Sequence, residues 1–153
     1  MTSDILLRLV VLLLVALVMC LLLWFGRRLV EKSRQRALSA TPFKQESVDT
    51  PKDRALRVRV LAFTSEDCRQ CHQFQEPVLR RVIEARGDIV SVEYIDAPSS
   101  PELTQRYQVL TLPTTVLLDA TGKAQAINYG FTNAMRLLKQ VDDILEQEAL
   151  KID

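Results

Sequence analysis

Residues 57–86 read "RVRVLAFTSEDCRQCHQFQEPVLRRVIEAR" and place two cysteines between a predicted strand and a predicted helix. The first part, 57–63, alternates and then becomes continuously apolar, as a strand does when it enters a core covered on both sides. Apolar residues then recur at helical spacing: Cys71, Phe74, Val78, Leu79, Val82 and Ile83. A Cys-x-x-Cys pair, Cys68 and Cys71, is therefore expected at the amino-terminal end of a helix over 68–86.

The rest of this region continues with alternating strands and helices. Apolar and β-branched runs predict three more strands: 89–95, 114–119 and 124–130. A short helix is expected at 99–107 with Ser100 as its N-cap, and Thr132 is expected to cap a last helix. The predicted apolar face of the last helix has six residues: Met135, Leu137, Leu138, Val141, Ile144 and Leu145. This order predicts an α/β fold, in which a mixed four-stranded sheet carries helices on both faces.

The start of the chain predicts a membrane anchor. Residues 9–25 contain no charged side chain, and with the apolar residues before Arg8 they form a segment, 5–26, that follows a short tail, 1–4. As a helix this segment is about 31 Å long, which matches the hydrocarbon core of a bilayer. The apolar run is too long for a cleaved signal peptide, and "WFGRRL" offers no small-residue cleavage site. We expect a retained single-pass helix in the cell membrane.

A basic juxtamembrane segment and a linker, 27–55, follow the predicted anchor. Five cations come directly after the span: Arg27, Arg28, Lys32, Arg34 and Arg36. The positive-inside tendency therefore predicts that the domain at 56–153 faces the cytoplasm, with an extracytoplasmic domain as the alternative. Residues 38–55 are rich in Ser, Thr, Pro and charge without helical or strand periodicity, as is typical of a linker.

Composition limits the classes of partner. The chain has 153 residues, 48% of them hydrophobic and 25% charged, which suits one ordinary domain with an accessory segment. A formal net charge of +1, without a local cluster of basic and aromatic residues, gives no indication of a nucleic-acid partner.

The motif "CRQCH" (68–72) fits two chemistries. As Cys-x-x-Cys it is a dithiol that can cycle with a disulfide, and as Cys-x-x-Cys-His it is the attachment pattern of c-type haem with His72 as an iron ligand. A haem protein needs a second axial ligand, but His72 is the only histidine and Met135 is predicted to lie in an apolar face. Three potential ligands are too few for a closed zinc site. We therefore expect no metal and no cofactor beyond the cysteine pair.

The predicted domain resembles the thioredoxin family. Besides Cys68 and Cys71 at the end of the first strand, "YQVLTLPT" (107–114) looks like that family's Tyr-x-[Ile/Val]-x-x-x-Pro-Thr element. Asp96 matches the usual end of the second strand, and Gly130 matches a late glycine. The resemblance implies that Pro113 is a cis proline facing the disulfide. It also implies that Leu112, Pro113 and Thr114 bind substrate by exposing backbone for strand-like hydrogen bonds.

Several positions depart from the family pattern. Thr64 replaces an aromatic residue before the site, and Arg69-Gln70 replaces a Gly-Pro dipeptide. Ala62 and Val92 stand where the family has a buried acid and its lysine partner, so both members of that pair are absent together. A further departure is Pro77, the helix-kinking proline, which lies one residue later than usual.

These features predict a membrane-tethered thiol-disulfide oxidoreductase that reduces protein disulfides. Cys68, beside the positive end of the helix dipole, is the expected nucleophile, and the shielded Cys71 is the expected resolving cysteine. Arg69, Gln70 and His72 are expected to tune the redox chemistry, with His72 or water accepting a proton. Expected partners are protein disulfide or dithiol substrates, a reductase or membrane redox partner, and the lipid bilayer. The alternative is a non-catalytic thioredoxin-like binding module at the membrane.

Overall fold

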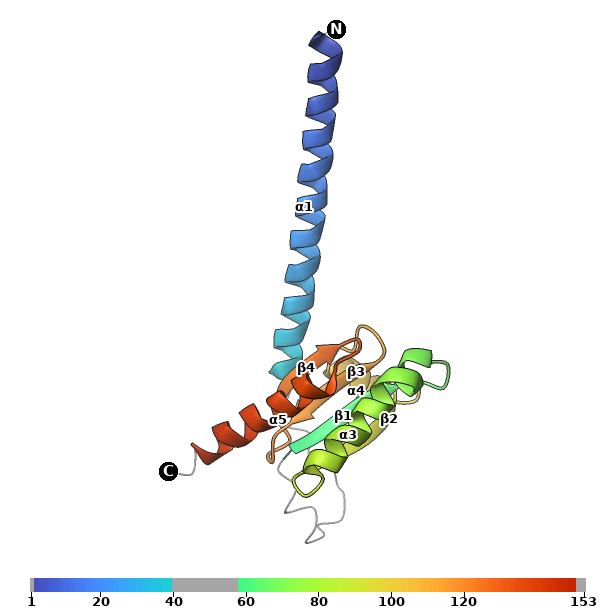
Figure 1. The fold of residues 1–153 in the computed structure, drawn as a ribbon, viewed down its shortest axis with the longest axis vertical. Helices are drawn as coiled ribbons and strands as arrows, with labels where there is room; N and C mark the ends of the chain where they lie inside the picture. The colour runs from blue at the N-terminus through green and yellow to red at the C-terminus, as the bar shows by residue number, and fades with distance from the viewer. Residues whose placement is uncertain (1, 40–57, 151–153) are drawn as a thin grey trace. The chain divides into compact units, whose positions relative to one another are not determined.

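The apolar amino-terminal sequence folds as one uninterrupted helix, α1 (Thr2–Leu38) (Figure 1). A computed structural model describes residues 2–39 and 58–150, and the chain divides into two units, 1–35 and 36–153. Arg8–Leu38 is long and apolar enough to cross a membrane, with a mean hydropathy of 3.0 in its most apolar window, none of which is buried. The helix continues without a break into the basic segment, where the Arg28 guanidinium lies 5.0 Å from the centre of the Trp24 ring.

A mixed four-stranded sheet forms the centre of the second unit. Its strands are β1 (Val58–Thr64), β2 (Val90–Asp96), β3 (Thr114–Leu118) and β4 (Ala124–Tyr129), in the order β2-β1-β3-β4. β1 pairs with β2 in parallel, as the strand–helix–strand pattern requires, whereas β3 pairs antiparallel with both β1 and β4. The predicted mixed sheet is confirmed, with strand ends shifted by about one residue from the sequence-based bounds.

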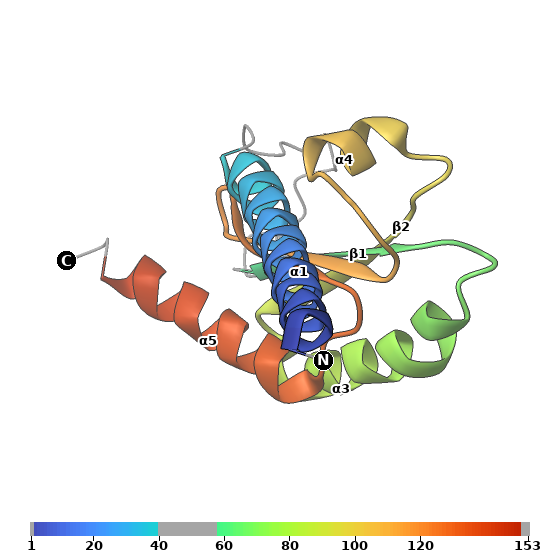
Figure 2. The same ribbon diagram turned by 90° about the horizontal axis from the view of Figure 1, so that it is seen from above.

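Helices cover both faces of this sheet (Figure 2). A short π-helical turn, η1 (Cys71–Gln75), leads into α3 (Glu76–Arg86), and α4 (Pro101–Arg106) and α5 (Ala134–Ala149) follow along the chain. On one face, α3 and α5 pack on a core that includes Val60, Leu79 and Val141. On the other face, Leu103 of α4 packs against a second core that contains Phe63 and Tyr107. The thioredoxin-like α/β fold expected from the sequence is therefore confirmed.

Several predicted helix details were wrong. Asn133, not Thr132, caps α5, because the Asn133 side chain accepts a hydrogen bond of 2.9 Å from the Arg136 N–H. Met135 is 81% exposed, and the buried face of α5 consists of Leu137, Val141 and Ile144.

The helix predicted over 68–86 also buries a narrower face than its apolar spacing suggests, because Phe74 and Ile83 are exposed. Ser100 does stand at the N-cap position of α4, but its side chain makes no capping hydrogen bond.

Candidate active site

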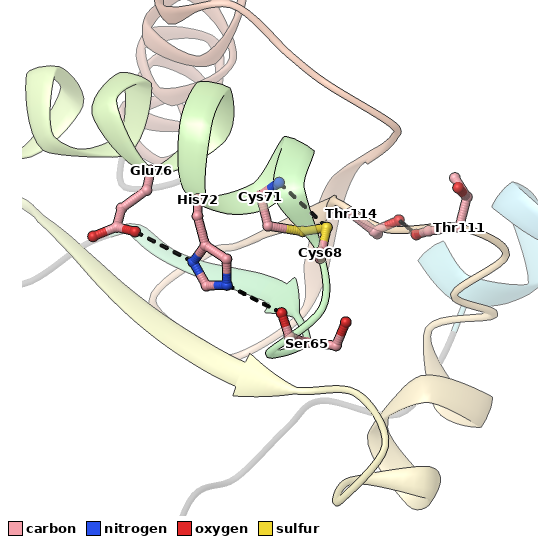
Figure 3. The surroundings of a disulfide bond; sticks show 7 residues. All are labelled: Ser65, Cys68, Cys71, His72, Glu76, Thr111 and Thr114. Atoms are coloured by element: carbon pink, nitrogen blue, oxygen red, sulfur yellow. Dashed lines mark hydrogen bonds and ion pairs between the residues drawn. A yellow bond between two sulfur atoms is a disulfide. The ribbon is translucent and has the colours of Figure 1, made fainter.

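A disulfide joins Cys68 and Cys71 where the chain leaves β1 and enters the following helix (Figure 3). Cys68 is half-buried, whereas Cys71 is buried with 4% of its surface exposed. The Cys71 N–H points to the Cys68 sulfur at 3.2 Å. A backbone donor of this kind at a helix start stabilises negative charge on a cysteine sulfur.

The π-helical turn η1 follows directly after the disulfide. The Glu76 N–H donates to the Cys71 carbonyl, which is an i→i+5 hydrogen bond and encloses one more residue than the α-helical i→i+4 bond. Pro77 lies one residue later than in the family pattern, and this turn accommodates the additional residue between Cys71 and Pro77. Phe74 lies on its exposed side and makes an edge-to-face contact with Phe131, with 6.4 Å between ring centres.

Gln75 connects η1 to the loop before α5. Its side chain is 2% exposed, donates to the Thr132 carbonyl at 3.2 Å and accepts from the Thr132 N–H at 2.9 Å. Two residues earlier, the Gly130 N–H donates to the Pro113 carbonyl at 2.8 Å, and Gly130 has a φ of 81°, which favours glycine. These bonds tie the turn after the cysteines to the proline segment.

The Leu112–Pro113 peptide bond is cis, the isomer that the family resemblance implied. Pro113 and Thr114 share a cavity with Cys71. The Thr114 side chain is fully buried, and its hydroxyl donates to the Thr111 carbonyl at 2.6 Å. Leu112 is half-buried and packs on the second core.

A cavity of about 260 Å³ adjoins the buried Cys71. Ala62 of β1 lines it with a side chain too small to fill it, at the position where the family pattern has an acid. Thr64 lines the same cavity, and within the described residues its hydroxyl oxygen is buried without a hydrogen-bond partner. His72 and Glu76 contribute polar groups to the same space.

His72 lies between two oxygen acceptors (Figure 3). Its Nε2 is 3.2 Å from the Ser65 carbonyl oxygen, and its Nδ1 is 3.6 Å from Glu76 Oε2. The other oxygen of Glu76 accepts from Arg80 at 2.9 Å. That hydrogen bond, with smaller contributions from the charge of Arg80 and from His72, lowers the pKa of Glu76 despite some burial. Burial, with the negative charge of Glu76, raises the pKa of the neighbouring Tyr94.

The remaining predicted site residues lie on the surface. Arg69 and Gln70 are both exposed on the first turn between the two cysteines. Among residues 2–39 and 58–150, no group of three or more His, Cys, Asp or Glu side chains is arranged to hold a metal ion. In the disulfide, Cys68 and Cys71 bond each other, which supports the dithiol interpretation of "CRQCH" over the haem interpretation.

Sequence reasoning missed Gln75, Glu76 and Phe131. A usable signal existed for Gln75, because residues 71, 75, 78, 79 and 82 form one helical stripe in which it is the only polar member. Glu76 also had a signal, because it lies four residues after His72 in the predicted helix 68–86. Phe131 contacts Phe74 from a distant part of the sequence, which spacing within one helix does not reveal.

A disulfide at the end of a central strand, beside a cis proline, defines the class of thioredoxin-fold redox proteins. Residues 45–145 match the family of thioredoxin-like domains. A relative, the chloroplastic thioredoxin Y of Oryza sativa subsp. japonica, is 28% identical over 123 residues, which are 78% of this chain and 72% of the relative. The chain belongs to the thioredoxin family, whose members are thiol-disulfide oxidoreductases.

Solved structures agree with this assignment. Oxidized mitochondrial thioredoxin 3 from Saccharomyces cerevisiae is similar with a TM-score of 0.51 and 26% identity, over 60% of this chain and 82% of that chain. The germline-specific thioredoxin Deadhead from Drosophila melanogaster is similar with a TM-score of 0.52 and 24% identity, over 60% of this chain and 84% of that chain. At 24% identity, the similarity to Deadhead shows a common fold alone.

Proposed function

We propose that this protein is a membrane-tethered oxidoreductase that reduces protein disulfides with Cys68 and Cys71. The observation that carries the proposal is the asymmetry of the pair: Cys68 is half-buried and accepts the Cys71 N–H at 3.2 Å, whereas Cys71 is buried. A cysteine that attacks a substrate needs access to solvent, whereas a resolving cysteine attacks only the neighbouring sulfur and can be buried.

The reaction takes two exchange steps. The Cys68 thiolate attacks one sulfur of a substrate disulfide, forms a mixed disulfide and releases the other substrate sulfur as a thiolate. Cys71 then loses its proton and attacks the Cys68 sulfur, so that the second substrate sulfur leaves as a thiolate. The substrate gains two electrons and Cys68–Cys71 becomes a disulfide, which a reductase or a membrane redox partner must reduce again. Apart from the cysteine pair, the cycle uses no cofactor.

Substrate binding is assigned to the segment around Leu112, Pro113 and Thr114. Pro113 shares the Cys71 cavity, and the half-buried Leu112 precedes it, so a substrate segment laid along this backbone comes next to the sulfur atoms. The buried Thr114 hydroxyl bonds the Thr111 carbonyl, so we assign Thr114 the role of holding the turn. Arg69 and Gln70, exposed between the cysteines, are assigned to redox tuning, and Arg69 adds a positive charge beside Cys68.

Disulfide reduction by the full chain tests the activity. We expect the detergent-solubilised protein to accelerate insulin reduction by dithiothreitol, and Cys68→Ser to abolish the acceleration. Cys20→Ser is the matched control, since Cys20 lies in α1, and it should react as fast as the wild type. Equal rates for the wild type and Cys68→Ser would instead favour the second candidate, a thioredoxin-like module that binds a partner without redox exchange.

The cytoplasm is the proposed location of the thioredoxin-like domain, with α1 in the cell membrane. The cations that follow the apolar run support this sidedness: Arg27, Arg28, Lys32, Arg34 and Arg36. A reporter fused after Asp153 tests it in intact cells. Protection of the reporter from an impermeant reagent is the expected result, and labelling without permeabilisation would place the domain outside.

A further inference from the structure

The resolving step requires a proton acceptor for Cys71. A thiol attacks a disulfide only as the thiolate, and burial of Cys71 in apolar surroundings disfavours that charge. Ala62 of β1 lines the same cavity as Cys71, and its side chain cannot take up a proton. A titratable group that lines the cavity beside Cys71 is therefore a candidate for the acceptor.

Three titratable side chains line this cavity besides Cys71: His72, Glu76 and Tyr94. Tyr94 on β2 has its pKa raised by burial, so it remains a neutral phenol and accepts no proton from a thiol. Glu76 is bound to Arg80, and that hydrogen bond lowers the pKa of the carboxylate, which makes it a poor base. His72 remains as the basic group.

The contacts of His72 are compatible with the role of proton acceptor. The Ser65 carbonyl can only accept a hydrogen bond, so the neutral tautomer that satisfies it carries its hydrogen on Nε2 and has its lone pair on Nδ1. Nδ1 faces Glu76 Oε2 at 3.6 Å, and a proton arriving at Nδ1 is met by a carboxylate. Glu76 is itself paired with Arg80 of the same helix, α3.

The cavity supplies a route between Cys71 and His72. Its volume of about 260 Å³ has room for several water molecules. The buried Thr64 hydroxyl, which has no hydrogen-bond partner among the described residues, is a polar group available to water there.

We propose that His72 accepts the proton of the Cys71 thiol through this cavity, and that Glu76 is a positioning residue that holds and stabilises the protonated ring. This inference rests on the proposed function. In the step, the Cys71 S–H bond breaks and the proton passes by way of water to Nδ1. The sulfur lone pair forms the bond to the Cys68 sulfur, and the bond between Cys68 and the substrate sulfur breaks. The imidazolium later returns its proton to solvent.

An aromatic disulfide that releases a coloured thiolate, 5,5′-dithiobis(2-nitrobenzoate), separates the two exchange steps. With reduced full-length protein in a Cys20→Ser background, attack by Cys68 releases the first coloured thiolate and attack by Cys71 releases the second. We expect His72→Gln to slow the second release by about tenfold or more near neutral pH, as for loss of a general base, and to leave the first within about twofold.

The pH profile of the second release tests Glu76, measured from about pH 5.5 to about pH 9, where a histidine base changes its charge. Glu76→Gln removes the negative charge beside Nδ1, so the second release should slow across the profile. Glu84→Gln, an exposed carboxylate on the same helix, is the matched control and should leave the profile unchanged.

The outcomes separate the two proposals. A normal first release, with a second release that His72→Gln leaves unchanged across the pH range, would overturn this inference and leave the proposed function standing. If His72→Gln slows the second release while Glu76→Gln behaves like Glu84→Gln, Glu76 has no positioning role. No first release from the unsubstituted active site would contradict the proposed function and this inference with it.

Discussion

Gln75 shows how a single polar residue can organise the surroundings of the disulfide. It occupies a position within an apolar helical stripe, and both of its polar atoms bind the backbone of Thr132. Because the loop from Gly130 to Thr132 also binds the Pro113 carbonyl, Gln75 acts on the proline segment through backbone contacts alone. Gln75 therefore has a structural role, and the loop that it holds contacts the proline beside the disulfide.

Replacing Gln75 by Leu should destabilise the domain. The substitution leaves a buried N–H and a buried carbonyl of Thr132 without partners, so we expect the free energy of unfolding to fall by roughly 2 to 4 kcal/mol. Urea unfolding followed by circular dichroism measures the change. Gln73→Leu alters an exposed position in the same turn and should stay within about 0.5 kcal/mol of the wild type. Equal losses in both variants would refute the role assigned to the Gln75 side chain.

At the scale of elements, the β3–β4 hairpin depends on a buried carboxylate. The Asp119 side chain accepts hydrogen bonds from the N–H groups of Thr121 and Lys123 and from the Gln125 side chain. Burial by itself raises the pKa of Asp119, but these bonds and that of the Thr121 hydroxyl outweigh it, and the net pKa is lowered. The turn is thus stabilised by the charged form of the side chain.

The stability contributed by Asp119 should depend on pH. Because its folded-state pKa is depressed, the contribution is fully present above the ordinary aspartate pKa of about 3.9 and is lost as the pH falls through the lowered value. We expect Asp119→Asn to lower the free energy of unfolding by about 2 kcal/mol at neutral pH and to reduce its acid dependence. Asp143→Asn, which removes an exposed ion pair with Lys139, should cost at most about 0.5 kcal/mol. A matching acid dependence in the wild type and Asp119→Asn would contradict this account.

Element type and order could be predicted from the sequence because they depend on local periodicity. The four strands and the Cys-x-x-Cys position followed from apolar runs and their spacing, and the cis isomer of Pro113 followed from a family motif. Helix faces were less predictable, because Phe74 and Met135 count as apolar although the fold exposes them. The two hydrogen bonds of Gln75 join it to Thr132, more than 50 residues away, which no local pattern contains.

At the scale of the whole molecule, the length of α1 affects how the proposed anchor emerges from a bilayer. A continuous helix of 37 residues is about 55 Å long, against a hydrocarbon core of about 30 Å. Residues 27–38 therefore extend the helix by about 18 Å beyond the predicted span. This extension carries the basic side chains, and in a bilayer the first of them, Arg27 and Arg28, would lie at the level of the headgroups.

Charges within α1 should abolish membrane association. Leu13 and Leu17 lie near the middle of the apolar segment and are exposed along the helix. Each lysine at the centre of a span costs roughly 2.5 to 3.5 kcal/mol, so Leu13→Lys with Leu17→Lys should remove the protein from floating vesicles in a density gradient. Met135→Lys in α5, combined with Leu150→Lys directly after this helix, adds the same number of charges at exposed positions and should leave flotation intact. Flotation of the α1 variant would show that another part of the chain holds the membrane.

The position of Trp24 determines what the intrinsic fluorescence of this protein reports. Trp24 is the only tryptophan of the chain and lies in α1. The Arg28 guanidinium lies over its ring, 5.0 Å from the ring centre. The unit that contains the disulfide has no indole for Cys68–Cys71 to quench. Emission excited at the indole band should therefore shift to shorter wavelength when the protein passes from dilute detergent into lipid vesicles. The thiol chemistry will have to be followed by a probe introduced for that purpose.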